Sequence, residues 1–239
     1  MIKLRTTRTF YALAGVAIGL SLLSVILAAS LSEPTRGTVL VDVFQVDVSS
    51  LFIMILAIVG ITGEWRHRTI TSSLLAAPDR IRFLAAKVLA FAAAGALLSL
   101  TISITTAIIG YAILESRDLP TPAFDELLGQ VARNALVASL LGAVGVGLGG
   151  LVRNQPTAIV AILVFSFVVD PLLGALAPEV ERFSPLGALP DAIGGYESGD
   201  AGLSGVDFLS FGPALALMLA WIAALSAAAG ALLHARDVE

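Results

Sequence analysis

The sequence predicts an all-α, polytopic integral membrane protein with six transmembrane helices and both termini in the cytoplasm. Three observations predict this class: the share of apolar residues, the spacing of long apolar runs, and the placement of Lys and Arg between those runs. Of the 239 residues, 57% are hydrophobic and 13% are charged, and the mean hydropathy is +0.94. These values lie outside the usual range of soluble globular domains, so a lipid bilayer is the expected solvent.

Six apolar runs account for the predicted spans of a single transmembrane domain over residues 1–239. A hydrocarbon core about 30 Å thick requires about 20 apolar residues per helix, and backbone groups in lipid must be hydrogen-bonded within the helix. The strands of a transmembrane β-barrel would alternate in polarity, whereas these runs are continuously apolar and rich in Ala and Leu. The spans cover about residues 10–31, 48–63, 84–114, 127–151, 157–177 and 211–233.

The first three spans differ in character. The first follows a basic N-terminus, as a signal peptide would, but its apolar run exceeds the usual signal core of about 7–15 residues and predicts an uncleaved anchor. The second is short and can extend backward through Val46. The third is long enough to cross with strong tilt or to include an interfacial turn near Lys87.

Polar residues interrupt the fourth and fifth predicted spans but not the sixth. In the fourth, Arg133 and Asn134 enter early, so we expect the lipid-spanning part to begin near Ala135, with residues 125–133 as an amphipathic lead-in. The fifth ends beyond the Asp170-Pro171 pair, and the sixth is uninterrupted.

Orientation follows from the basic residues, because positively charged loops near span ends stay on the cytoplasmic side. With the N-terminus inside, the outer segments hold only four basic residues and most of the acidic ones. The inner segments hold the remaining basic residues: Lys3, Arg5, Arg8, Arg66, Arg68, Arg80, Arg82, Lys87, Arg153 and Arg236. The predicted location is the cytoplasmic membrane, and no basic patch with interleaved aromatics indicates a nucleic-acid partner.

The charged segment between the second and third spans carries the strongest functional signal. Glu64 stands where the second helix leaves the membrane, Trp65 suits headgroup depth, and Arg66 suits an anionic inner leaflet. Apolar residues at roughly helical spacing then precede Pro78, which predicts a short surface helix that ends before this proline. The alternative is that this segment is an ordinary positively charged cytoplasmic loop without a specific function.

The order of residues in this segment resembles the permease subunits of type-2 ATP-binding-cassette (ABC) exporters. The resemblance covers the whole chain in outline, and the segment departs from the family pattern at Arg68, where Gly is common. It implies that residues 64–82 form a coupling helix that docks on a separate ATPase subunit. The implied coupling residues are Glu64, Arg66, Arg68, Thr69, Leu74, Leu75, Pro78 and Arg80.

The resemblance further implies a division of labour. ATP and Mg would be bound by the partner subunit, and this chain, which has no phosphate-binding Gly-x-x-x-x-Gly-Lys-Ser/Thr loop, would bind no cofactor directly. A second permease chain, identical or related, would complete a homodimer or heterodimer around the path. The outer connection over residues 178–210 contains Ser184-Pro185, as in the family, and by analogy residues 186–193 can dip back as short re-entrant helices.

Glycines in the fourth span predict helix packing. Gly142, Gly145 and Gly149 fall on one helical face, where small residues let membrane helices approach closely. The same stretch matches the dinucleotide fingerprint Gly-x-Gly-x-x-Gly from Gly145 to Gly150, but it lies inside an apolar run without a preceding strand. Packing is therefore the favoured interpretation.

Asp170 is the one acidic residue well inside a predicted span, which makes it a functional candidate by default. The structural alternative is a helix-end carboxylate that faces water or pairs with Arg133 or Arg182, and the functional one is a place in the transport path or proton coupling. A row of hydroxyl residues from Ser99 to Thr106 presents a similar choice between lining a path and bonding within its own helix.

Metal binding and catalysis are not predicted. His67 and His234 stand alone in separate segments, and the chain has no Cys. No nucleophile and base occur together at membrane depth, so an intramembrane enzyme is a minor alternative and no catalytic residue is assigned. The remaining alternative is a non-transporting membrane anchor or assembly factor.

Overall fold

The computed structural model describes residues 8–45, 48–66, 80–152, 154–197 and 206–235. These residues form helices and connections without a strand, and they include six stretches long and apolar enough to cross a membrane. The predicted all-α membrane class is confirmed to this extent. The first part of the chain forms α2 (Arg8–Leu31), the π-helix η1 (Leu40–Phe44), α3 (Ser49–Arg66), α5 (Arg80–Ser116) and α6 (Phe124–Leu151).

The second part begins with one apolar stretch built from three helical segments: α7 (Gln155–Val164), the π-helix η2 (Phe165–Val169) and α8 (Asp170–Leu176). Two short helices follow, α9 (Pro178–Glu181) and α10 (Ala188–Gly194), and the long α11 (Phe211–Ala235) ends the described chain. The π-helical turn ends two residues before Pro171, whose ring removes a backbone donor and disturbs regular α-helical bonding.

Helices α5 and α6 are among those that extend beyond their predicted spans. The 37 residues of α5 give a length of about 55 Å, well above the thickness of a hydrocarbon core. In α6 the expected lead-in and the span form one continuous helix from Phe124, whose N-terminus is capped because the backbone N–H of Ala123 donates to Glu126 Oε2 over 2.8 Å. Helical bonding therefore continues through Arg133 and Asn134.

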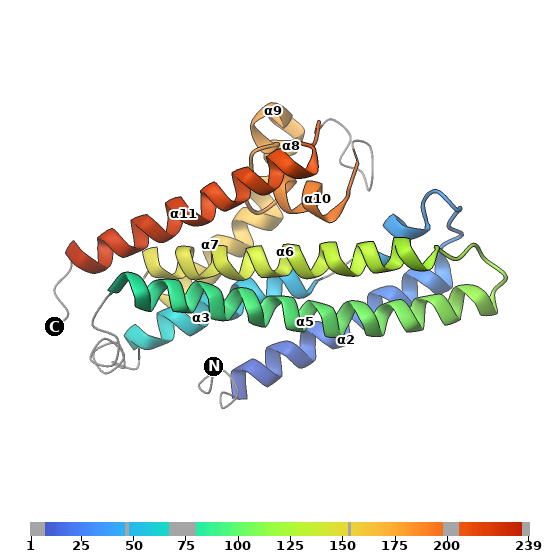
Figure 1. Cartoon of the computed structure of the whole chain (residues 1–239), viewed down its shortest axis with the longest axis horizontal. Helices are drawn as coiled ribbons and strands as arrows, with labels where there is room; N and C mark the ends of the chain where they lie inside the picture. Colours follow the sequence, from blue (N-terminus) through green and yellow to red (C-terminus); the bar gives the residue numbers. More distant parts are fainter. Residues whose placement is uncertain (1–7, 46–47, 67–79, 153, 198–205, 236–239) are drawn as a thin grey trace.

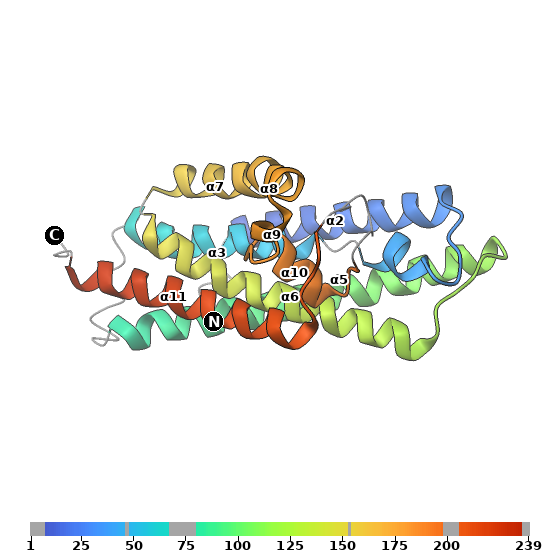
Figure 2. The ribbon, with the colours of Figure 1, turned by 90° about the horizontal axis from the view of Figure 1, so that it is seen from above.

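Helix α6 lies at the centre of the bundle. It packs most extensively against α5, then α3, then α11, and it is the most buried of the candidate spans (Figures 1 and 2). Helix α2 covers the outside of α5 and α3. In contrast, the stretch from Gln155 to Leu176 and helix α11 keep most of their apolar surface exposed, which suits contact with lipid or another membrane chain.

Glycines set how closely the central helices approach. A Cβ on Gly142 would lie 2.6 Å from the backbone oxygen of Phe91 in α5, and one on Gly145 would lie 2.6 Å from that of Met54 in α3. A Cβ on Gly149 would lie 2.4 Å from the Ile61 side chain and 3.0 Å from the Cα of Ile58 in α3. The three glycines of the predicted packing face thus lie directly against neighbouring backbones, where no larger residue fits without moving a helix.

Directly after α5, an arginine side chain forms hydrogen bonds to the end of α2. After α5 the chain turns through Asp118, which has a left-handed conformation (φ 54°), a conformation that Asp tolerates better than most residues. The neighbouring Arg117 donates from Nη1 to the carbonyl oxygens of Ala29 and Ser32, over 2.6 and 3.0 Å. These carbonyls at the end of α2 lack helical partners, so Arg117 links α5 to α2.

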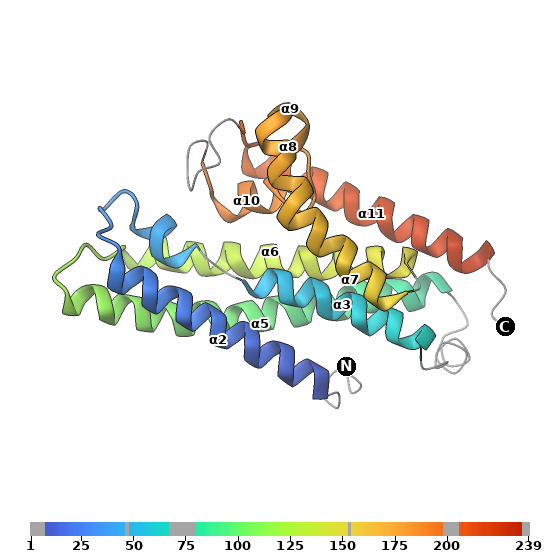
Figure 3. The same cartoon turned by 180° about the vertical axis from the view of Figure 1, so that it is seen from behind.

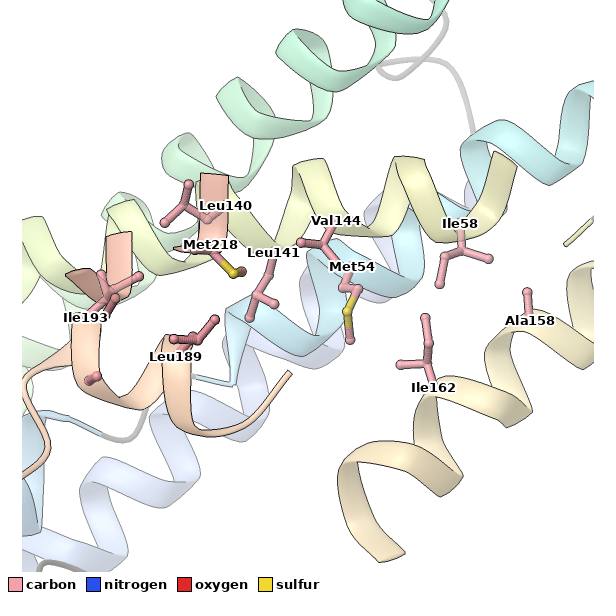
Figure 4. Packing of buried hydrophobic residues seen from close by; sticks show 12 residues of the cluster. Met54, Ile58, Leu140, Leu141, Val144, Ala158, Ile162, Leu189, Ile193 and Met218 are labelled. Atoms are coloured by element: carbon pink, nitrogen blue, oxygen red, sulfur yellow. The ribbon is translucent and has the colours of Figure 1, made fainter. Parts of the chain in front are cut away.

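Helices α8, α9 and α10 form a hairpin that folds back onto the bundle (Figures 1 and 3). Helix α10 packs against α6 and α11. Its Leu189 and Ile193 are fully buried and point toward Leu141 of α6 and Met218 of α11 (Figure 4). The connection between the fifth and sixth candidate spans therefore contributes α10 to the hydrophobic core.

We expect Gly145→Ala to lower the free energy of unfolding by about 1–3 kcal/mol, because the added methyl group would force α6 away from the α3 backbone. Thermal or denaturant unfolding in detergent measures this change. Gly129→Ala is the matched control in the same helix: nothing lies within 4 Å of its Cβ position, so helix propensity alone should stabilise by about 0.5–1 kcal/mol. Equal effects at the two positions would contradict the close-packing argument.

Candidate functional site

An ion pair joins the helix ends on either side of residues 67–79. Lys87 Nζ in α5 lies 2.6 Å from Glu64 Oε1 in α3, and its ammonium group lies 5.7 Å from the centre of the Phe83 ring. Glu64 is buried, and its second oxygen, Oε2, has no hydrogen-bond partner among the described residues. Glu64 therefore holds α3 to α5 instead of projecting from the surface.

Most of the predicted coupling residues lie outside the described residues: Arg68, Thr69, Leu74, Leu75 and Pro78. The surface helix expected before Pro78 falls in the same region. Arg66 is the last residue of α3 and Arg80 is the first of α5, so the described helices end at the two borders of the segment.

Buried amide side chains form a hydrogen-bonded network near the N-terminal end of α6. Asn134 Nδ2 donates to Ser103 Oγ of α5 over 3.2 Å, and Gln130 Nε2 donates to Asn134 Oδ1 over 2.8 Å. The backbone oxygen of Gly194, at the end of α10, accepts from both Gln130 Nε2 (3.1 Å) and Gln45 Nε2 (3.2 Å). Because buried polar groups are costly without partners, this network fixes how α5, α6, α10 and the end of η1 meet.

The hairpin encloses a second polar group around Asp170. Ser184 Oγ donates to Asp170 Oδ1 over 2.5 Å and accepts from the backbone N–H of Leu186 over 3.4 Å. Glu181 Oε1 accepts from the backbone N–H of Ala188, the first residue of α10, over 3.0 Å. The two carboxyl groups thus hold α8, α9 and α10 in one arrangement.

Asp170, Glu181 and Asp191 line a common cavity of about 450 Å³ between the hairpin helices. Leu186 and Asp191 also line an adjoining cavity of about 480 Å³ that reaches the amide groups of Gln45 and Asn134. The acidic cavity and the amide network are therefore neighbours across α10.

Burial raises the pKa of two carboxyl groups of the hairpin, those of Asp191 and Glu181. Burial, followed by the charges of Glu181 and Asp170, raises the pKa of Asp191 to about 7. Burial and then Asp170 also raise the pKa of Glu181, against the lowering effect of the hydrogen bond from Ala188. Asp191 therefore changes its charge near neutral pH, which is unusual for an aspartate.

Asp170 and Arg133, predicted as path residues or a structural ion pair, are not paired with each other in the described structure. The partner of Asp170 is Ser184, and the guanidinium of Arg133 lies beside Gly195, where it lines a separate cavity with Tyr196 and Glu197. The other expected partner, Arg182, lies 3.9 Å from Asp207 in an exposed pair. Asp170 instead shares its cavity with two acids from the connection between the fifth and sixth candidate spans, Glu181 and Asp191.

The hydroxyl row of α5 is mostly bonded within its own helix. Thr101, Thr105 and Thr106 donate to carbonyl oxygens four residues earlier, over 2.7 to 3.0 Å. Ser103 differs, since it meets Asn134 in the buried network. The intrahelical interpretation therefore describes the three threonines.

Sequence reasoning missed the roles of Gln45, Gln130, Glu181, Ser184 and Asp191. Residues 188–194 did carry a usable signal, because Ala188, Leu189, Ala192 and Ile193 recur at helical spacing and predict one buried face. Nothing in their spacing links Asp170 to acids 11 and 21 residues later.

Comparisons with known proteins do not assign a family: no family model, no curated protein and no solved structure matches this chain.

We expect Glu64→Gln to destabilise the protein by about 1–3 kcal/mol, because Lys87 would lose its partner in a largely buried site. The exchanged pair, Glu64→Lys with Lys87→Glu, should recover most of this loss. Unfolding in detergent of both single variants and the exchanged pair measures the coupling. Additive losses in the exchanged pair would show that the two side chains do not stabilise each other.

The raised pKa of Asp191 predicts a pH-dependent stability. Its carboxyl group binds a proton more tightly when folded, so its contribution to stability is present at low pH and falls as pH rises from about 4 to about 7. The stability difference between wild type and Asp191→Asn, measured by thermal unfolding from pH 4 to pH 8, should follow this decline and level off above pH 7. A difference that is constant with pH would contradict the raised pKa.

Proposed function

We propose that this chain is the permease subunit of a type-2 ABC exporter, located in the cytoplasmic membrane with both termini inside. The single observation that carries the proposal is the charged segment 64–82 between two apolar helices, with its ordered Glu, Arg-Thr, Leu-Leu, Pro and Arg residues. A separate ATPase subunit binds there and supplies the ATP and Mg chemistry. The chain itself is a transport subunit, not an enzyme.

The arrangement of the helices supports a mechanical role for this segment. Glu64 and Lys87 tie α3 to α5 beside it, and both helices pack closely against α6 at Gly142 and Gly145. A force on the segment therefore acts on α3, α5 and α6 together. The stretch Gln155–Leu176 has fewer contacts with the rest of the bundle and is free to change its packing against them.

The proposed orientation is supported by the position of the helix ends. The end of α3, the start of α5 and the end of α11 lie at one end of the molecule (Figures 1 and 3). The basic residues next to these ends, Arg66, Arg68, Arg80, Arg82 and Arg236, then face the cytoplasm together. The hairpin of α8 to α10 lies toward the outer side.

A second permease chain, identical or related, pairs with this one in the proposed transporter. Six largely apolar helices provide little polar lining alone, and the exposed apolar faces of Gln155–Leu176 and α11 offer surface for lipid and for this second chain. Substrate is then exported between the two subunits when the ATPase closes on ATP.

The test is purification of a tagged chain from its native membrane in mild detergent, with mass spectrometry of the proteins that co-purify. An ATPase subunit should be recovered with wild type and lost with Arg68→Glu, because charge reversal disrupts docking at the segment. Asp125→Arg, an exposed charge reversal at the opposite end of the bundle, is the matched control and should retain the ATPase.

Two results would overturn the proposal in different ways. Recovery of the ATPase with Arg68→Glu at the wild-type level would place its docking elsewhere. Absence of any ATPase from all samples would favour a non-transporting membrane anchor or assembly factor.

A further inference from the structure

The acidic cavity of the hairpin combines charge with apolar surface. Its carboxyl groups come from α8, α9 and α10, and its volume of about 450 Å³ falls within the range of small-molecule sites, about 300–1,000 Å³. Apolar side chains form much of the rest of the wall, namely Pro171, Leu186 and Val206.

No basic side chain balances this charge from the described wall of the cavity. Arg182 is directed to Asp207, and Arg133 lines the separate cavity beside Gly195. Helix α11, which packs on α10, carries no acidic or basic residue over its described length except His234. The acids Asp170, Glu181 and Asp191 therefore line one cavity without a cation among its described wall residues.

One carboxyl oxygen also lacks a partner. Glu181 is 5% exposed and lines the cavity, and its Oε2 atom has no hydrogen-bond partner in the described part of the chain, whereas Oε1 is held by Ala188. A buried carboxylate oxygen without a donor costs free energy. A donor that enters the cavity would satisfy this oxygen and reduce the repulsion among the three acids.

We propose that this cavity is a binding site for an organic ammonium group, held by Asp191 and Glu181, with the alkyl part of the ligand against Leu186 and Val206. The inference is independent of the proposed ATPase partner, because it concerns binding by this chain alone.

The chemistry of the wall favours an organic cation over a metal ion. The described residues contain no group of three His, Cys, Asp or Glu side chains with a geometry that could hold a metal ion. An ammonium group tolerates wider spacing, since it donates separate hydrogen bonds to separate carboxylates. Its alkyl chain gains contact with apolar wall residues that a metal ion would leave unused.

Binding should depend on pH through the ionisation of the cavity. A carboxylate attracts the cation only when ionised, and the pKa of Asp191 is about 7. The probe n-butylammonium, whose pKa is near that of lysine, stays protonated from pH 6 to pH 8. Its affinity should therefore rise about tenfold over this interval.

The experiment titrates n-butylammonium into the purified full chain in a neutral maltoside detergent at pH 8, with affinity measured by saturation-transfer NMR. Asp191→Asn and Glu181→Gln should each weaken binding about tenfold, since each removes a charged acceptor. Glu179→Gln removes an exposed carboxylate from the same α9 and should leave the affinity within about twofold. Thermal unfolding verifies that each variant is folded.

Ammonium groups occur on soluble amines and on lipid headgroups. A competition experiment distinguishes these two kinds of ligand. Competition by phosphatidylethanolamine added to the micelles would identify a headgroup as an occupant, whereas binding undisturbed by this lipid would favour a soluble amine. Equal binding of the uncharged n-butanol, equal losses in Glu179→Gln and Asp191→Asn, or affinity that does not change with pH would each overturn the proposal. None of these outcomes bears on recovery of an ATPase.

Discussion

The close contact of α6 with the backbones of α3 and α5 is the constraint on which the rest of the structure depends. In lipid, helices gain little from the hydrophobic effect against one another, so association relies on close packing and on internal hydrogen bonds. Gly142, Gly145 and Gly149 bring the backbones together, and Phe91 is buried within the same cluster. The Glu64–Lys87 ion pair at one end and the amide network at the other add polar contacts to these closely packed helices.

The amide network gives the hairpin its position on this framework. Gln130 and Gln45 both donate to the backbone oxygen of Gly194, so α10 is held through its main chain and through the burial of Leu189 and Ile193. Gly195 follows with a left-handed conformation (φ 94°) that ends the helix and lets the chain pass beside Arg133. A polar contact and an apolar contact therefore fix the same short helix.

The sequence was sufficient for features that depend on local pattern. Apolar runs placed five of the six candidate spans within about three residues at each end, whereas the second candidate span begins at Leu40, ahead of the predicted start at 48. The spacing of Gly142, Gly145 and Gly149 identified a face that does lie against other helices. The ends of α5 and α6 were harder, because capping by Glu126 and the turn at Asp118 extend helices past their apolar residues. Hydropathy does not register such polar contacts.

The acidic hairpin lay beyond sequence reasoning for a different reason. Asp191 stands in a segment rich in Pro, Gly and acidic residues, for which short re-entrant helices are expected only by analogy, and the packing of α10 onto α6 and α11 brings it into a cavity with Asp170. Likewise, Glu64 reads as a surface charge until α5 brings Lys87 to it. Both cases depend on contacts between distant parts of the chain.

The two sides of the acidic cavity, formed by α8 and α10, are attached to the helix bundle in different ways. Asp191 belongs to α10, which is bonded to the central helix α6, while Asp170 begins α8 within the stretch Gln155–Leu176 and is hydrogen-bonded to Ser184. A small tilt of α8 would alter the separation of the two carboxyl groups. Helix motion within the membrane and the electrostatic potential of the cavity are thus mechanically connected in this fold.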